Sequence, residues 1–212
     1  TSTSISLACG LAKARDLKGD HENIIAVIGD GSLSGGEAYE GLNNVVEQGS
    51  NMIVVINDNE MSIAENYGGY YRNLQELRRS KGKSENNLFK ALGFDYYYVE
   101  DGHNVEAMVN IFRQVKDSHY PVVIHVHTIK GKGYHYAEKN KEKFHAGGPF
   151  DIETGEYLSN ETKENYNDLT GKYLLKKMKD DSRVVAITSA TPVAIGMNEN
   201  NRRSEERRVG KV

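Results

Sequence analysis

The sequence predicts an α/β fold in which a parallel sheet is flanked by helices. Two observations lead to this prediction: continuous apolar runs, and amphipathic segments between them. Residues 23–31 and 51–63 are apolar runs that end in glycine or polar clusters, as strands buried on both faces do. Residues 35–49 between them have the pattern of an amphipathic helix that ends at Gly49. Strand, helix and strand together form a βαβ unit, whose two strands run parallel.

The rest of the chain repeats this alternation less clearly. The mostly polar stretch 135–170 has few apolar positions and is expected to be irregular. Further helices are expected within 4–16, 65–81, 84–95, 105–118 and 171–180. Further strands are expected at the YYYV segment 96–99, within 121–134 and at 183–188.

Composition and charge narrow the possible classes of protein. The chain has 212 residues, enough for one sizeable α/β domain or slightly more, with 38% hydrophobic and 27% charged residues. The net charge of −3 gives no reason to expect a nucleic-acid partner, and no apolar run predicts a membrane partner. The one cysteine excludes an internal disulfide framework and is typical of a cytoplasmic protein.

The two ends of the sequence indicate a chain that is truncated at both ends. Residue 1 is Thr and already lies in patterned sequence. The highly charged stretch 203–212 resembles the translated read-through of a sequencing adapter. We therefore expect residues 203–212 to be a non-native tail.

Polar clusters follow the first two predicted strands. Residues 29–32 read Gly-Asp-Gly-Ser, and residues 57–61 read Asn-Asp-Asn-Glu-Met. Asp30 and Asn59 are 29 residues apart, which is one loop–helix–strand passage, and ligands bind beyond the carboxyl ends of parallel strands. Carboxylate, amide and carbonyl oxygens suit Mg²⁺, and glycines let the backbone approach a diphosphate. Each cluster alone is an ordinary turn, but the pair at this spacing predicts a metal–diphosphate site.

Several segments carry a resemblance to a known family. They are TSTSIS, GDGSLSGGEAYEGLNN, INDNEMSI, DGHN, KGKGYHYAEKN and KFHAGGPFD. Together they resemble the 1-deoxy-D-xylulose-5-phosphate synthases, from residue 1 to about residue 198. The resemblance implies a thiamine-diphosphate-binding, transketolase-like fold.

Transferred position by position, the resemblance implies three groups of site residues. The Mg²⁺ ligands would be the Asp30 carboxylate, the Asn59 side chain and the main-chain carbonyl of Met61. Contacts to thiamine diphosphate would come from Thr1, Gly29, Gly31, Ser32, Asn59 and Tyr134. Substrate binding and proton transfer would involve His145, His103 and Lys130.

The resemblance also implies an activity and a domain order. The enzyme would condense pyruvate with D-glyceraldehyde 3-phosphate, with loss of carbon dioxide, to supply isoprenoid, thiamine and pyridoxal synthesis, and it would be a cytoplasmic homodimer. The family's activating glutamate is expected on a second domain and is not found in TPVAIG, so the fragment itself is expected to be inactive. The expected segments are a diphosphate-binding domain at 1–150, a linker at 151–182, the start of a pyrimidine-binding domain at 183–202 and the tail at 203–212.

Alternative interpretations remain at this point. The chain could belong to another thiamine-diphosphate enzyme, such as a transketolase or a 2-oxo-acid dehydrogenase component, or it could be a non-catalytic module that binds Mg²⁺ and a nucleotide. Lys130 could be an ordinary loop lysine, and His145 could lie at a loop tip. His125 and His127 are expected to have no ligand role, with one facing the core and the other the opposite face of the sheet.

Overall fold

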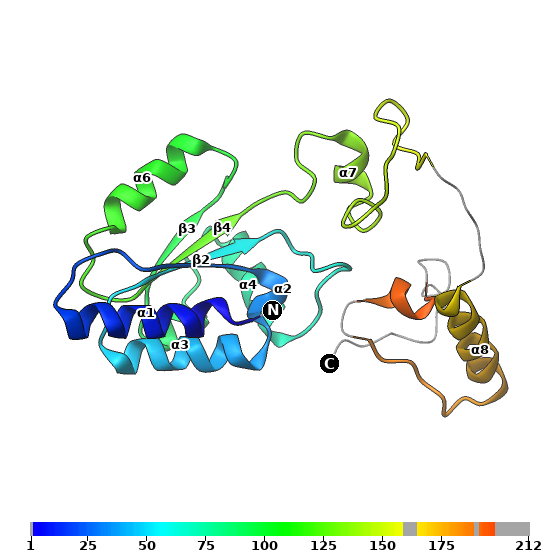
Figure 1. Ribbon diagram of the computed structural model, residues 1–212, viewed down its shortest axis with the longest axis horizontal. Coiled ribbons are helices and arrows are strands. Elements are labelled where there is room, and N and C mark those ends of the chain that lie inside the picture. The colour runs from blue at the N-terminus through cyan, green and yellow to red at the C-terminus, as the bar shows by residue number, and fades with distance from the viewer. Residues whose placement is uncertain (1, 159–164, 189–190, 198–212) are drawn as a thin grey trace. The chain divides into compact units, whose positions relative to one another are not determined.

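The structure is a computed structural model that describes residues 2–158, 165–188 and 191–197. These residues divide into two compact units (Figure 1). Unit 1 is made of residues up to 62 together with 68–129, and unit 2 is made of 63–67 together with the described residues from 130 onward. None of the helices in the described ranges has the length and apolarity needed to cross a membrane.

A parallel sheet forms the centre of unit 1 and confirms the predicted fold class. Its order is β1-β2-β4-β3, and every neighbouring pair is parallel. β1, β2 and β4 lie within segments that the sequence pattern predicts to be strands, and β3 begins one residue before the predicted segment 96–99. In the described residues the strands are β1 (Ile25–Gly29), β2 (Ile53–Asp58), β3 (Asp95–Val99) and β4 (Val122–His127).

Helices cover the two faces of this sheet unequally (Figure 1). One face packs against several helices, where residues such as Ile5, Leu42 and Leu77 form one apolar core with Ile28 and Ile56 of the sheet. Among the helices in the described ranges, a single one packs against the other face, where a second core forms over β2, β4 and β3. The helices of the first face are α1 (Ser4–Lys18), α3 (Gly36–Gln48), α4 (Gly69–Arg79) and α5 (Leu88–Ala91); the second face has α6 (Val105–Val115), and the short α2 (Asp30–Leu33) follows β1 directly.

Close packing of α1 on α3 requires a glycine. A Cβ atom at Gly41 would lie 2.9 Å from Cγ2 of Ile5 and 3.1 Å from Oγ of Ser6. Contacts this short are not tolerated in a packed core, so the small residues of α1 and α3 let the two helix backbones approach each other.

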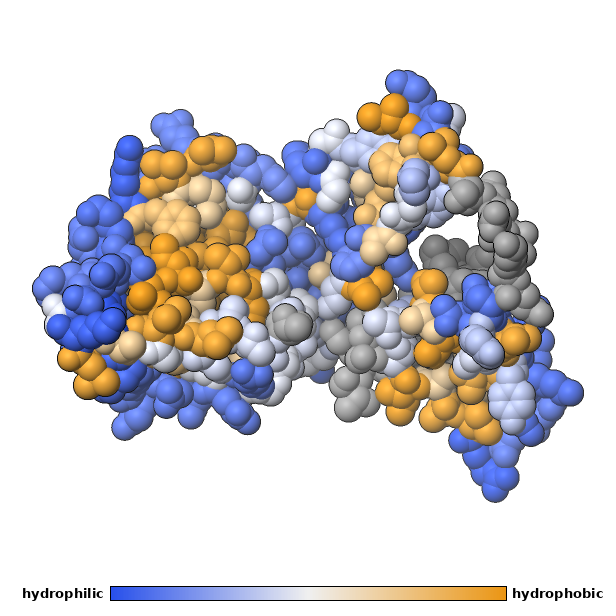
Figure 2. All heavy atoms as spheres, viewed as in Figure 1, coloured by the Kyte–Doolittle hydropathy of each residue, from blue (hydrophilic) through white to orange (hydrophobic). Residues whose placement is uncertain are grey.

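The α6 face of the sheet is open beside β1. Ile25 and Val27 point to this face and are 46% and 63% exposed, although both are large apolar residues. Figure 2 shows apolar side chains gathered on this part of unit 1. Both faces of a parallel sheet are normally covered, so this region is an unpartnered apolar surface of the described chain.

Unit 2 contains the helices α7 (His135–Lys139) and α8 (Tyr166–Asp180) and the 3-10 turn η1 (Pro192–Ile195). The pattern did not predict α7. Helix α8 begins earlier than the predicted 171, because Asn165 and Asp168 form a capping box at its N-terminus. An aromatic cluster of Tyr134, Tyr136, Phe144 and Phe150 packs the loop between α7 and residue 150.

The predicted strand at 183–188 is wrong. The described residues form no strand there, and Val185 and Ile187 are 67% and 61% exposed. An apolar alternating run becomes a strand only when a neighbouring strand pairs with it, and unit 2 has none among its described elements.

The compact units differ from the predicted segments. Residues 130–150 group with unit 2, whereas the sequence analysis assigned them to the first domain. The predicted linker 151–182 contains α8. The predicted domain order of the whole protein stays a prediction, and the predicted tail 203–212 lies outside the described residues.

Candidate functional site

The polar clusters of the first two strands lie at one edge of the sheet. Gly29, the last residue of β1, is the register partner of Asn57 in β2, and Asn57 in turn is the partner of Val126 in β4. The chain therefore leaves β1 and β2 at neighbouring positions. The spacing of Asp30 and Asn59 predicted this juxtaposition of the two clusters.

Direct contact joins the two loops. A Cβ atom at Gly31 would lie 2.1 Å from Oγ and 3.0 Å from Cβ of Ser62. Gly31 therefore has to be a glycine for the loop after β2 to pack against the start of α2. A Cβ atom at Gly29, by contrast, would meet no heavy atom within 4 Å. Ser32 is half-buried in α2.

Asp30 is buried at the start of α2. The residue is 2% exposed, and Oδ1 accepts a hydrogen bond of 2.9 Å from the N–H of Gly31. A buried carboxylate requires hydrogen-bond donors or a cation to offset its lost hydration.

The loop after β2 has a defined local conformation. The N–H of Glu60 donates to Oδ1 of Asp58 at 3.2 Å, and the N–H of Met61 donates to Oδ1 of Asn59 at 3.1 Å. Glu60 has a φ of +68°, in the left-handed region that is unfavourable for a residue with a side chain. The two side-chain hydrogen bonds thus stabilise a strained turn around Asn59.

The residues predicted to bind Mg²⁺ offer oxygen atoms of suitable type. Asp30 offers a carboxylate, Asn59 an amide oxygen, and Met61 a main-chain carbonyl, which are hard oxygen ligands of the type that Mg²⁺ prefers. The described residues contain no group of three or more His, Cys, Asp or Glu side chains that could hold a metal. The predicted set does not need such a group, because two of its three oxygens come from an amide and the backbone.

A buried polar network lies beneath the loop, and the sequence analysis missed it. Asp58 and His125 are fully buried, and Oδ2 of Asp58 accepts hydrogen bonds from Nε2 of His125, at 2.7 Å, and from Nη1 of Arg78. Burial would raise the pKa of the Asp58 carboxyl, but the hydrogen bond from His125 and the Arg78 charge outweigh it and lower the pKa. Burial lowers the pKa of His125, which favours the neutral form of its ring.

The prediction that His125 and His127 face opposite sides of the sheet is wrong. Residues two apart on a strand share a face. His125 contacts Asp58, and Nε2 of His127 lies 3.8 Å from Oε1 of Glu60, so both rings lie toward the same loop.

His103 lies at the same edge of unit 1. Its Nε2 accepts a hydrogen bond of 2.8 Å from the N–H of Ile129, which follows β4. A Cβ atom at Gly102 would lie 2.3 Å from Cγ1 of Val126, so the Asp-Gly-His turn can pack here only with glycine. The turn is thereby held at the carboxyl end of β4, beside the end of β2.

Lys130, Tyr134 and His145 lie together in unit 2. Nζ of Lys130 donates to Nδ1 of His145 at 2.9 Å. Burial, and then the positive charge of Lys130, lower the pKa of His145. The Tyr134 ring packs against Phe144, and its hydroxyl donates to the carbonyl of Ile152 at 3.0 Å. Thr1, the remaining predicted contact, lies outside the described residues.

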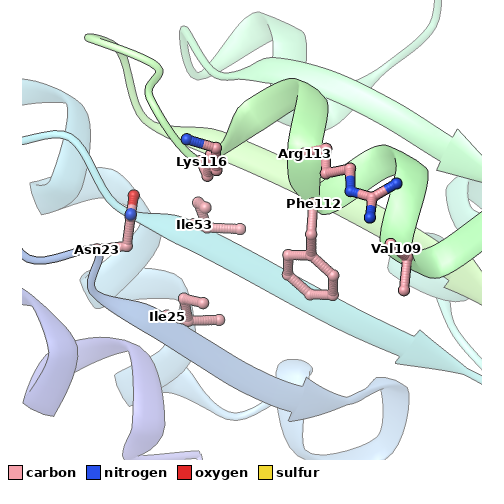
Figure 3. A pocket seen from close by; sticks show the side chains of 7 residues that line it. All are labelled: Asn23, Ile25, Ile53, Val109, Phe112, Arg113 and Lys116. Carbon is pink, nitrogen blue, oxygen red and sulfur yellow. The ribbon is translucent and has the colours of Figure 1, made fainter.

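An apolar groove of about 400 Å³ lies at the opposite end of the strands. Ile25 and Ile53, the first residues of β1 and β2, face Phe112 and Val109 of α6 across it (Figure 3). It shares no residue with the polar clusters. The groove is therefore part of the open α6 face and not of the candidate site.

Comparisons with known proteins agree with the resemblance stated above. The family model described as 1-deoxy-D-xylulose-5-phosphate synthase matches residues 1–86 and 80–128. Relatives with that name come from Desulforudis audaxviator, 42% identical over 98% of the chain, and Caldanaerobacter subterraneus subsp. tengcongensis, 42% identical over 93%. Another, from Carboxydothermus hydrogenoformans, is 41% identical over 93%. The chain spans only 37–38% of the length of these relatives.

The contact between Gly31 and Ser62 yields a first prediction. Gly31→Ala should lower the free energy of unfolding by about 1–3 kcal/mol, because the new methyl group overlaps Ser62. Gly29→Ala, where a Cβ meets open space, is the matched control, and the double variant Gly31→Ala/Ser62→Gly should recover part of the loss. Urea denaturation measures all of them. Equal stability of the two single variants would show that the loops do not touch.

The Lys130–His145 pair yields a second prediction. Lys130→Met removes one of the two causes that lower the pKa of His145, so that pKa should rise toward the ordinary histidine value. NMR titration of the His145 ring protons measures it. Lys132→Met, at an exposed lysine of the same loop, should leave the pKa of His145 unchanged. A pKa that stays the same or falls in Lys130→Met would contradict the pairing.

Proposed function

Because the chain belongs to the 1-deoxy-D-xylulose-5-phosphate synthase family, we propose that it supplies the Mg²⁺- and diphosphate-binding part of an enzyme that uses thiamine diphosphate. That enzyme condenses pyruvate with D-glyceraldehyde 3-phosphate and releases carbon dioxide and 1-deoxy-D-xylulose 5-phosphate. The product serves isoprenoid, thiamine and pyridoxal synthesis. Family membership covers residues 1–128, which include both polar clusters of unit 1.

One observation carries this proposal: the packing of Gly31 against Ser62 at the carboxyl edge of the sheet. It brings the loop that contains Asp30 next to the loop that contains Asn59. A transketolase and a 2-oxo-acid dehydrogenase component would share such an edge, but the family match favours the synthase. The non-catalytic nucleotide-binding alternative has no comparable support.

The residues of unit 1 would bind the cofactor through its diphosphate. Asp30, Asn59 and the carbonyl of Met61 would hold Mg²⁺, whose charge offsets that of the diphosphate. Gly29, Gly31 and Ser32 would let the backbone approach the diphosphate oxygens. Thiamine diphosphate, when bound, supplies the carbon nucleophile and accepts the electron pair that decarboxylation releases.

Residues of unit 2 would handle protons and substrate. Since Nδ1 of His145 accepts a hydrogen bond from Lys130, its ring proton lies on Nε2. Because its lowered pKa keeps the ring neutral near pH 7, this histidine can both accept and donate a proton during the condensation. Lys130 would bind the anionic substrate groups and hold the imidazole, while Tyr134, Thr1 and His103 would line the cofactor and substrate region.

Location, oligomeric state and substrates are proposed for the full-length enzyme, whose relatives are longer than this chain. We place it in the cytoplasm as a homodimer, with pyruvate and D-glyceraldehyde 3-phosphate as its substrates. The 212-residue chain is proposed to be inactive alone, because the family's activating glutamate belongs to a second domain of which residues 183–202 would be the start.

Binding of the cofactor yields a third prediction. Thiamine diphosphate with Mg²⁺ should raise the thermal midpoint of the wild-type chain, since a ligand at a hundred times its Kd stabilises the fold by about 2.7 kcal/mol. Asp30→Ala should abolish that rise, and the exposed control Asp20→Ala should retain it. A larger rise with ATP and Mg²⁺ would favour the nucleotide-binding alternative. An undiminished rise in Asp30→Ala would remove Asp30 from the metal site.

Catalysis yields a fourth prediction. The purified 212-residue chain, supplied with Mg²⁺, thiamine diphosphate and both substrates, should release no carbon dioxide from labelled pyruvate above the rate of the Asp30→Ala variant. The reason is that the TPVAIG segment lacks the family's activating glutamate. Turnover that Asp30→Ala eliminates would prove the chain active and contradict the need for a second domain.

A further inference from the structure

We propose that Arg78, with Asp58 and His125, is a positioning residue that holds the Asn59–Met61 loop in its metal-binding conformation. The inference rests on the proposed function, because it assigns a task to residues that would contact neither the metal nor the cofactor. Arg78 lies at the end of α4, Asp58 at the end of β2, and His125 in β4. The loop is thus linked to three separate elements of unit 1.

Arg78 contacts the loop on both sides of Asn59. Its Nη1 donates to Oδ2 of Asp58, the residue before Asn59. Its Nε lies 3.1 Å from Oε1 of Glu60, the residue after Asn59. The Arg78 side chain is 11% exposed and that of Asp58 is fully buried, so the first contact is shielded from water. A planar guanidinium can make both contacts at once, which a lysine cannot.

Asp58 connects this arginine to the loop backbone. While Oδ2 accepts from Arg78 and His125, Oδ1 accepts the N–H of Glu60 at 3.2 Å. Glu60 has the left-handed φ of +68° noted above, a conformation that costs free energy in a residue with a side chain. The contacts of Asp58 and Arg78 with Glu60 offset this cost, and the resulting turn determines where the Asn59 amide and the Met61 carbonyl lie.

His125 is itself held in one orientation. The ionised carboxylate of Asp58 can only accept, so the proton of the neutral His125 ring lies on Nε2. Nδ1 then accepts from the hydroxyl of Tyr96, 2.7 Å away. Tyr96 in turn stacks on Phe89, with ring centroids 5.8 Å apart and an interplanar angle of 7°. The network is therefore anchored in the apolar core on the α4 face of the sheet.

A purely structural role for the network predicts something different. Removal of Arg78 would then lower the stability of all of unit 1 and leave the affinity of the folded chain for Mg²⁺ unchanged. A positioning role predicts a local effect on the loop. Arg79, the next residue of the same helix, is exposed and provides a matched control.

Amide hydrogen exchange of the cofactor-free chain is the first test. In Arg78→Met, the amides of Glu60 and Met61 should exchange about tenfold faster, because a charge-assisted hydrogen bond is lost. The β2 amides of Val54 and Val55 should exchange as in the wild type, and Arg78→Lys should restore part of the protection. Unchanged loop amides, or equal acceleration in the loop and in β2, would overturn the proposal. Arg79→Met should match the wild type.

Mg²⁺ titration in the presence of thiamine diphosphate is the second test. Calorimetry is done at a temperature where every variant is folded. The Kd for Mg²⁺ should be about tenfold or more higher in Arg78→Met than in the wild type, because loss of a residue that orients metal ligands typically weakens metal binding by that much. Arg79→Met should stay within about twofold of the wild type. An unchanged Kd in Arg78→Met would overturn the positioning role. A wild-type chain that binds neither Mg²⁺ nor thiamine diphosphate would overturn the proposed function instead, and amide exchange would then decide whether Arg78 positions the loop.

Discussion

Parallel pairing of β1 with β2 is the constraint on which the candidate site depends. Because Gly29 lies opposite Asn57, Asp30 and the loop around Asn59 leave the sheet side by side. A shift of one residue in this register would turn the buried side chains of β1 to the other face and separate the two loops. The packing of Gly31 against Ser62 then fixes the loops against each other once the strands are paired. The register therefore determines which side chains of β1 are buried and which two loops meet at the candidate site.

Burying the network of Asp58, Arg78 and His125 costs desolvation free energy. Replacing a buried ion pair with apolar residues of similar volume is often neutral or stabilising, so stability alone does not explain Asp58 and Arg78. Such a network can supply conformational specificity, because its hydrogen bonds form only in a narrow range of side-chain orientations. Its location directly beneath the left-handed residue Glu60 is consistent with that use.

Much of the fold and part of the site could be predicted from local patterns. Continuous apolar runs indicated β1, β2 and β4, and the spacing of Asp30 and Asn59 indicated that their loops meet. The buried network escaped prediction because Asp58, Arg78 and His125 are distant in the sequence and have no fixed spacing. The run 183–188 shows the opposite failure, since its pattern is that of a strand but strand formation depends on a partner that the pattern does not reveal.

The position of β1 in the sheet links the behaviour of the chain in solution to its ligands. Among the described strands β1 is an edge strand, and its residues Ile25 and Val27 are exposed. An unpaired apolar edge is where copies of a protein adhere to one another. The same strand leads directly into Asp30. A ligand that binds Asp30 only in the native state would also keep β1 in its native pairing. Under the proposed function, Mg²⁺ with a diphosphate compound would therefore reduce aggregation of the chain.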